Sequence, residues 1–314
     1  MPIDPHIAAL LQLMKPEGAP ELHTLPVAPV RDALIAQATA PDMPKRPLAA
    51  VENRHIAGPA DELPVRIYHP EGTGPFPLLV FLHGGGWVIC NLDTHDDICR
   101  DLCADVGAVV VSVDYRLAPE HKFPAGLDDV LVATQWAAAH AAELGADATR
   151  IALVGDSAGG NLAIACALRC GMAGAPALRA LAPLYPVSDL RLPSCHASVE
   201  VMGRGDYGLS AKDMQWFISH YLSDATDALN PFVSPLLSDA LAVLPPTLLV
   251  TAQYDPLCDE GKALAERIAA AGVPVNHHCY EGLPHAFMNM TALAPAARRA
   301  SQAISAALAA MLAR

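Results

Sequence analysis

The sequence has few basic residues. Lysine and arginine total 20, against 33 aspartate and glutamate residues, which gives a formal net charge of −13. A chain with this charge repels phosphate backbones and anionic lipid surfaces. We therefore expect no nucleic-acid partner.

Long apolar runs are also missing. No uninterrupted apolar stretch reaches the ~18 residues that a membrane-spanning helix needs, so we expect no membrane insertion. The N-terminal segment MPIDPHIAALLQLM carries Asp4 and no basic residue before its short apolar run, which Gln12 interrupts. A secretory signal has the opposite arrangement, with basic residues before an uninterrupted apolar run. These features predict a soluble, cytoplasmic protein.

Cysteine patterns that hold metals or build disulfide frameworks are absent. The eight cysteines are scattered along the chain, with no Cys-x-x-Cys and no Cys/His finger spacing. Cys99 and Cys103 are four residues apart, as are Cys166 and Cys170, so on a helix each pair lies on one face. We interpret these four as small buried hydrophobic residues and expect no metal site.

The remaining pattern is that of an α/β protein. Hydrophobic residues make up 53% of the chain, enough for a sizeable core. Short apolar runs alternate with helix-like stretches, which predicts a largely parallel sheet flanked by helices on both faces. The pattern is weak over 15–47, where prolines are frequent and strand-like runs are few, and again over 188–244. We therefore predict a core formed by 48–187 and 245–314, interrupted by an insertion at 188–244.

One motif lies between a predicted strand and a predicted helix. Gly155-Asp156-Ser157-Ala158-Gly159 fits Gly-x-Ser-x-Gly, in the strand-turn-helix context of a nucleophile elbow. A serine on so sharp a turn has a strained backbone, and side chains at the flanking glycines would collide with the neighbouring strand and helix. The motif predicts Ser157 as a nucleophile.

A nucleophilic serine needs a base, and that base needs an acid to orient it. In this fold the order along the chain is serine, acid, histidine, each just after a strand, and Asp255 and His285 fit it. Less favoured bases are His277 and His278, which fall inside a predicted strand. Each residue also has a purely structural alternative: Asp255 could only cap the following helix, and His285 could be a structural loop residue.

A glycine-rich segment, His83-Gly84-Gly85-Gly86-Trp87, follows another predicted strand. Consecutive glycines let backbone N–H groups turn toward a ligand, and such donors stabilise the oxyanion of a tetrahedral intermediate. The alternatives are a plain turn or a phosphate cradle, but a phosphate loop would have a following lysine that this segment lacks. His83 is expected to orient the loop rather than to react.

Together these segments resemble the hormone-sensitive-lipase-like branch of the α/β hydrolases, the bacterial family IV esterases. The matching segments run in family order from about Leu78 to Phe287; they are HGGGW, SVDYRLAPEHKFPA, GDSAGGNLA, TAQYDPLCDEG and GLPHAF.

The resemblance implies an α/β-hydrolase fold with a helical cap made from 1–47 and the insertion. It implies a catalytic triad of Ser157, Asp255 and His285, and it allows a homodimer. By the same resemblance the oxyanion donors are the N–H groups of Gly85, Gly86 and Ala158. His83 and Gly84 support the loop that holds these donors. Buried polar contacts of Asp156, Asp114 and Arg116 are implied to stabilise the serine turn and the loop.

We expect a serine carboxylesterase that hydrolyses short- to medium-chain acyl esters through an acyl-enzyme, with no cofactor. An amide or carbamate hydrolase on the same triad is one alternative, because the fold does not fix the leaving group. A non-catalytic small-molecule-binding protein on a hydrolase scaffold is another. In the predicted cap, Trp216, Phe217 and Tyr221 either line the pocket or pack within the cap.

Overall fold

The computed structural model describes residues 1–14, 18–40 and 45–313. Its centre is an eight-stranded sheet in the order β1-β2-β4-β3-β5-β6-β7-β8. The strands are β1 (Ala50–Ala57), β2 (Glu62–His69), β3 (Phe76–Leu82), β4 (Val109–Val113), β5 (Ala146–Asp156), β6 (Ala180–Leu184), β7 (Thr247–Tyr254) and β8 (Val275–Pro284).

The sheet is mostly parallel. β2 runs antiparallel to both β1 and β4, and the strands from β4 to β8 pair in parallel. Every residue of β4 and β6 is buried, as expected for strands covered on both faces. The apolar runs predicted as strands correspond to β2, β3, β4, β5, β7 and β8, whereas β1 and β6 were not predicted from the sequence.

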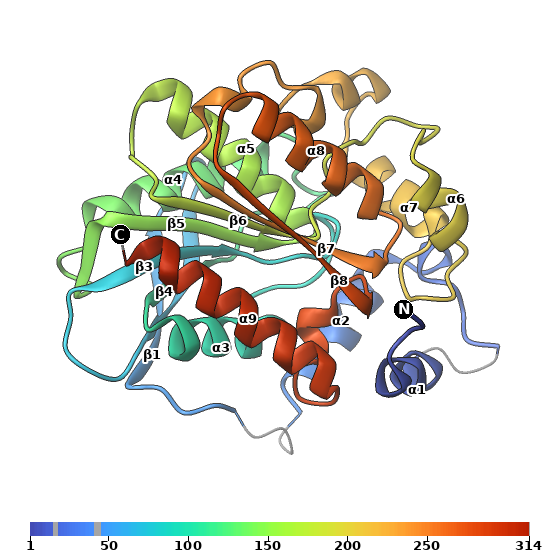
Figure 1. Cartoon of the computed structure of the whole chain (residues 1–314), viewed down its shortest axis with the longest axis horizontal. Helices are drawn as coiled ribbons and strands as arrows, with labels where there is room; N and C mark the ends of the chain where they lie inside the picture. Colours follow the sequence, from blue (N-terminus) through green and yellow to red (C-terminus); the bar gives the residue numbers. More distant parts are fainter. Residues whose placement is uncertain (15–17, 41–44, 314) are drawn as a thin grey trace.

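Helices cover both faces of the sheet (Figure 1). Apolar residues of α4, α5 and α8 form one core with one face, and those of α3 and α9 form a second core with the other. The predicted α/β-hydrolase fold class is therefore confirmed. These helices are α3 (Asp96–Val106), α4 (Ala125–Ala139), α5 (Ala158–Ala173), α8 (Cys258–Ala270) and α9 (Pro295–Leu312), and a short 3-10 helix, η5 (Phe287–Met290), precedes α9.

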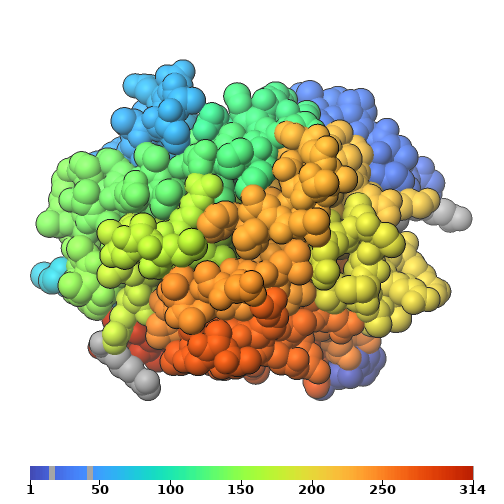
Figure 2. Space-filling model, turned by 90° about the horizontal axis from the view of Figure 1, so that it is seen from above, coloured from blue at the N-terminus to red at the C-terminus, as the bar shows by residue number. Residues whose placement is uncertain are grey.

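Two further groups of short helices complete the described structure. One comes from the N-terminal segment and the other from residues 188–244, whose first part Figure 2 shows in yellow at one end of the molecule. They are α1 (Pro5–Met14), η1 (Leu22–Thr24) and α2 (Val27–Ala38), then α6 (Ala197–Met202), α7 (Ala211–Tyr221), η2 (Ala225–Leu229), η3 (Pro235–Leu237) and η4 (Leu241–Val243).

The two groups are joined by hydrogen bonds. The backbone N–H of His23 in η1 donates to Asp213 Oδ1 of α7 at 3.1 Å, and the His23 Nδ1 atom lies 3.0 Å from the same oxygen. Asp213 also caps α7 together with Ser210. Part of the predicted N-terminal cap, residues 15–17 and 41–44 of 1–47, lies outside the described residues.

Cys99, Cys103, Cys166 and Cys170 are all 1% exposed or less, which confirms them as buried residues of the two helices α3 and α5. Among the helices of the described ranges, we find none with the length and apolar content required to cross a membrane.

Candidate active site

The three residues of the predicted triad meet at the C-terminal ends of three parallel strands. Ser157 follows β5, Asp255 follows β7 and His285 follows β8. The His285 Nε2 atom lies 2.9 Å from Ser157 Oγ, and His285 Nδ1 lies 2.7 Å from Asp255 Oδ2. The three side chains therefore form one continuous hydrogen-bonded line.

Asp255 is held in place from its other side. It is fully buried, and the backbone N–H of Leu257 donates to its Oδ1 atom at 2.8 Å. One oxygen of the carboxylate is thus fixed by the backbone, which leaves the other for His285. The alternative bases lie elsewhere on β8, where His277 is bonded to Thr251 at 3.0 Å and His278 is exposed.

The backbone at Ser157 is strained, as the motif predicts. Its φ is 54° and its ψ is −118°, a conformation that L residues rarely adopt. A β-carbon at Gly159 would lie 1.9 Å from the carbonyl oxygen of Leu82, and one at Gly155 would lie 2.4 Å from the carbonyl oxygen of Gly159. Both flanking positions therefore require glycine for the turn to pack against its neighbours.

The glycine-rich loop after β3 lies beside this turn. Gly85 and Gly86 line the same cavity as Ser157 and His285, with φ values of 110° and 59°. Within the described residues, no acceptor receives a hydrogen bond from the N–H of Gly85, Gly86 or Ala158. Three backbone donors near the serine are therefore available to a ligand.

Buried polar contacts tie the loop to the serine turn. The N–H of Gly84 donates to Asp156 Oδ1 at 2.8 Å, and the His95 Nε2 atom lies 3.3 Å from the same oxygen. Burial alone would raise the pKa of Asp156, but His95 and the Gly84 hydrogen bond lower it overall. A carboxylate thus fixes the loop. His95 was not singled out from the sequence, because it belongs to no motif.

His83 supports the loop without reaching the serine. Its ring stacks on Tyr115, with centroids 4.3 Å apart, and its Nδ1 atom lies 2.7 Å from the carbonyl oxygen of Gly84. Burial lowers the pKa of His83 to about 3, so this imidazole stays neutral at physiological pH.

Asp114 and Arg116 differ in what they contact. Burial raises the pKa of Asp114 to about 6, and the carboxyl is bonded to the backbone of Leu92, beyond the glycine-rich loop. Arg116 forms a bidentate pair with Asp129 of α4 and also donates to the carbonyl of Ala125. Its contacts therefore stabilise the start of α4 and do not reach the serine turn.

The cavity beside Ser157 has a volume of about 190 Å³. Its walls are largely apolar and come from both the core and the helices of 188–244. Of the cap aromatics, Phe217 lines the cavity, whereas Tyr221 is buried against Trp87 with stacked rings 4.3 Å apart. Apolar residues that sequence reasoning did not place here are Val187, Leu209, Met214, Ile218 and Leu257.

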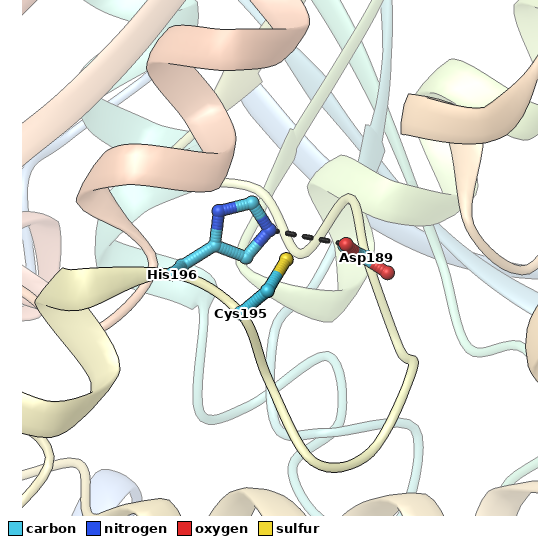
Figure 3. Close-up of side chains that lie close together, drawn as sticks. All are labelled: Asp189, Cys195 and His196. Atoms are coloured by element: carbon cyan, nitrogen blue, oxygen red, sulfur yellow. Dashed lines mark hydrogen bonds and ion pairs between the residues drawn. The ribbon is translucent and has the colours of Figure 1, made fainter.

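Asp189 is an acidic residue in this mostly apolar wall. Figure 3 shows the His196 ring directed at its carboxylate, 3.0 Å away, with Cys195 beside them. The ligand atoms of these three residues lie within 4.8 Å of one another. However, Arg191 already pairs with both carboxylate oxygens, at 2.8 and 2.7 Å. We interpret this cluster as an ion-pair network that neutralises Asp189.

The sheet order, with these side chains at the carboxyl ends of the parallel strands, is the arrangement of an α/β hydrolase. A family model described as alpha/beta hydrolase fold matches residues 79–289. The chain belongs to this family, and the predicted resemblance to its hormone-sensitive-lipase-like branch is confirmed.

Named relatives are similar over most of their length. The chain is 42% identical over 270 residues to "Carboxylic ester hydrolase LipN" of Mycobacterium tuberculosis, covering 84% of this chain and 71% of that protein. It is 37% identical over 308 residues to "Ethyl acetate hydrolase" of Pseudomonas putida, covering 92% and 93%. A solved structure of a hyperthermophilic esterase from Pyrobaculum calidifontis superposes with a TM-score of 0.94, at 37% identity and 99% coverage of both chains.

Proposed function

We propose that this chain, a carboxylic ester hydrolase, cleaves short- to medium-chain acyl esters with Ser157 as nucleophile, His285 as general base and Asp255 as the group that orients His285. The observation that carries this proposal is the line of hydrogen bonds from Asp255 through His285 to Ser157, at 2.7 and 2.9 Å. A serine hydroxyl becomes an effective nucleophile when a base at this distance removes its proton.

The reaction has two halves. In the first, His285 takes the proton of Ser157 while Oγ attacks the ester carbonyl carbon, and the N–H groups of Gly85, Gly86 and Ala158 hold the oxyanion. The intermediate collapses to an acyl-enzyme as His285 gives its proton to the departing alcohol. In the second half, water takes the place of the serine hydroxyl and releases the acid.

Asp156 and His83 are positioning residues in this account. The Gly84 N–H bond to Asp156 keeps the glycine-rich loop beside the serine turn, and the neutral His83 ring packs beneath the loop. Neither side chain touches the reacting atoms. Both act by fixing the backbone donors in advance, which is how oxyanion stabilisation avoids reorganisation during the reaction.

The cavity supports a small substrate. Its volume of about 190 Å³ lies below the roughly 300–1,000 Å³ of pockets that take drug-sized ligands. Its apolar wall, which includes Leu209, Met214 and Phe217, suits an acyl chain better than a charged group. A long fatty chain would have to extend past the helices of 188–244.

The test is hydrolysis of p-nitrophenyl esters with acyl lengths from about two to sixteen carbons, compared with Ser157→Ala prepared identically. We expect short chains to react fastest and the variant to be inactive. Matched ester and anilide substrates test the amidase alternative. If the wild type hydrolyses none of the esters, the binding-protein alternative replaces the esterase.

Three further parts of the account are proposals. They are a division into core (48–187 and 245–314) and cap (1–47 and 188–244), a cytoplasmic location and a homodimer. The bonds between His23 and Asp213 support a cap built from two segments. Light scattering of the purified chain tests the dimer, and cell fractionation tests the location.

A further inference from the structure

Two cysteines on neighbouring elements face each other outside the cavity. Cys258 is the first residue of α8, and Cys279 lies in β8, paired with Thr251 of β7. Their sulfur atoms are 3.9 Å apart, close to van der Waals contact. Neither side chain lines the cavity or contacts the proposed triad.

The two thiols differ in exposure and in acidity. Cys279 is exposed, whereas Cys258 is half-buried. The hydrogen bond from the Cys258 thiol, with a smaller contribution from Thr251, outweighs burial and lowers the pKa of Cys279 to about 6. The same hydrogen bond raises the pKa of Cys258. The contact between the two thiols thus favours an exposed Cys279 thiolate beside a protonated Cys258.

This combination distinguishes the pair from the other cysteines of the described chain. Cys166 and Cys170 have a similar sulfur separation, 4.0 Å, but both are buried, so a solute cannot reach them. Cys195 is exposed, and its neighbours are Asp189 and His196 rather than a second thiol. Among the described cysteines, an exposed thiol with a second thiol in contact is found at Cys279 and its neighbour Cys258.

We propose that Cys258 and Cys279 are a modification site, where a hydroperoxide such as hydrogen peroxide converts the two thiols into a reversible intramolecular disulfide. First, the Cys279 sulfur attacks the peroxide; an S–O bond forms, the O–O bond breaks, and the leaving hydroxide takes up a proton to become water. The sulfur is oxidised to a sulfenic acid and the peroxide is reduced.

In the second step the Cys258 sulfur attacks the sulfenic sulfur of Cys279. The S–S bond forms, the S–O bond breaks, and hydroxide leaves with the Cys258 proton as a second water. The sum is two thiols and one peroxide giving one disulfide and two waters. A dithiol reductant reverses the product by thiol–disulfide exchange.

The disulfide would link the turn at 255–258, which contains the proposed catalytic acid, covalently to β8 at the edge of the sheet. Cys258 donates its N–H to the carbonyl of Asp255 at 3.1 Å, and Leu257 between them holds the Asp255 carboxylate. A link from Cys258 to β8 closes a loop around α8 and restricts the unfolded chain. We therefore expect the oxidised form to melt several degrees higher and to keep its esterase activity.

The experiment treats the reduced full-length protein with a small excess of hydrogen peroxide and records intact mass, free thiols and migration on a non-reducing gel. We expect a loss of about 2 Da, two fewer thiols that react with Ellman's reagent, a monomeric band and full reversal by dithiothreitol. Peptide mapping should link Cys258 to Cys279. Cys258→Ser and Cys279→Ser should abolish the mass loss, while Cys195→Ser, which removes another exposed thiol, should retain it.

Three results would overturn the proposal: unchanged thiols, a gain of about 32 Da at Cys279 from sulfinic acid, or a disulfide between two chains. The mass readout does not depend on ester hydrolysis. An inactive Ser157→Ala variant should form the same disulfide, so failure of this inference and failure of the proposed function are separate outcomes.

Discussion

The ring of Phe217, on α7, lies directly against the backbone of Gly86 in the glycine-rich loop. A β-carbon built at Gly86 would be 2.2 Å from that ring, and the φ of Gly86 is 59°. An insertion helix therefore packs onto the loop that supplies the proposed oxyanion donors. Only glycine fits this position, because a β-carbon would overlap the Phe217 ring and because the positive φ is unfavourable for other residues.

Gly86→Ala should consequently damage catalysis more than folding. Displacing one oxyanion donor costs about 100-fold or more in kcat, and we expect a loss of at least this size in kcat/KM for p-nitrophenyl butyrate. The matched control is Gly107→Ala, which also has a positive φ, 68°, but has no atom within 4 Å of the new carbon. It should lower the melting temperature and leave kcat/KM near wild type. Equal kcat/KM for Gly86→Ala and wild type would contradict the oxyanion assignment.

Met214 of α7 limits the length of the cavity in this account. Met214→Ala removes three heavy atoms from the apolar wall and so makes room for a longer acyl chain. The ratio of kcat/KM for octanoyl to that for butyryl esters should rise by roughly three- to tenfold, which corresponds to burial of one or two more methylenes at about 0.8 kcal/mol each. Met172→Ala, at a methionine that is 61% exposed on α5, should leave the ratio unchanged. An unaltered ratio for Met214→Ala would place the acyl chain elsewhere.

Glu260 should make the protein less stable as pH rises. Its carboxyl is fully buried and accepts backbone N–H bonds from Ser188 and Asp189, and burial raises its pKa to about 8. Between pH 4.5 and about 8 the unfolded state has lost this proton and the folded state keeps it. Unfolding therefore releases a proton, and the free energy of unfolding falls as pH rises.

Glu260→Gln keeps an oxygen for the two backbone donors and removes the titration. Across pH 5 to 8, urea unfolding of the variant should lack a decline on the order of a few kcal/mol that the wild type shows. Glu266→Gln, at an exposed position of the same helix, should behave as wild type. Parallel pH profiles for Glu260→Gln and wild type would mean that Glu260 is already ionised.

Two histidines of one chain segment should differ sharply in function. His285→Ala removes the proposed base and should lower kcat by about 10⁴-fold or more, whereas His278→Ala, at an exposed position of β8, should keep wild-type activity. Comparable losses from both substitutions would indicate general damage to β8 rather than loss of a base.

The core was predictable where strands are apolar and end in a chemical motif, as β3, β5 and β7 do. β8 is more polar, but the motif that contains His285 follows it directly. β1 was missed because it is an exposed edge strand containing Glu52 and Arg54, without an apolar run. β6 was missed because Ala180–Leu184 is short and rich in alanine and proline, and only its burial in the finished sheet identifies it.

The cavity wall was less predictable than the triad. Met214 and Asp189 come from 188–244, where no period ties a residue to the serine, and His95 contacts Asp156 across a distance that the sequence does not encode. Phe217 was recognised as a cap aromatic, but its position against Gly86 depends on how α7 packs onto the core. Residues of a catalytic motif can be recognised from the sequence itself, whereas the residues that line a cavity depend on how distant segments pack together.

The most direct test of the central claim is covalent labelling with a p-nitrophenyl alkylphosphonate, followed by peptide mapping. The account predicts one adduct, on Ser157, formed with release of one p-nitrophenolate, absent from Ser157→Ala and much slower in His285→Ala. An active enzyme that carries the adduct on another residue, or that hydrolyses esters without being labelled at Ser157, would contradict it.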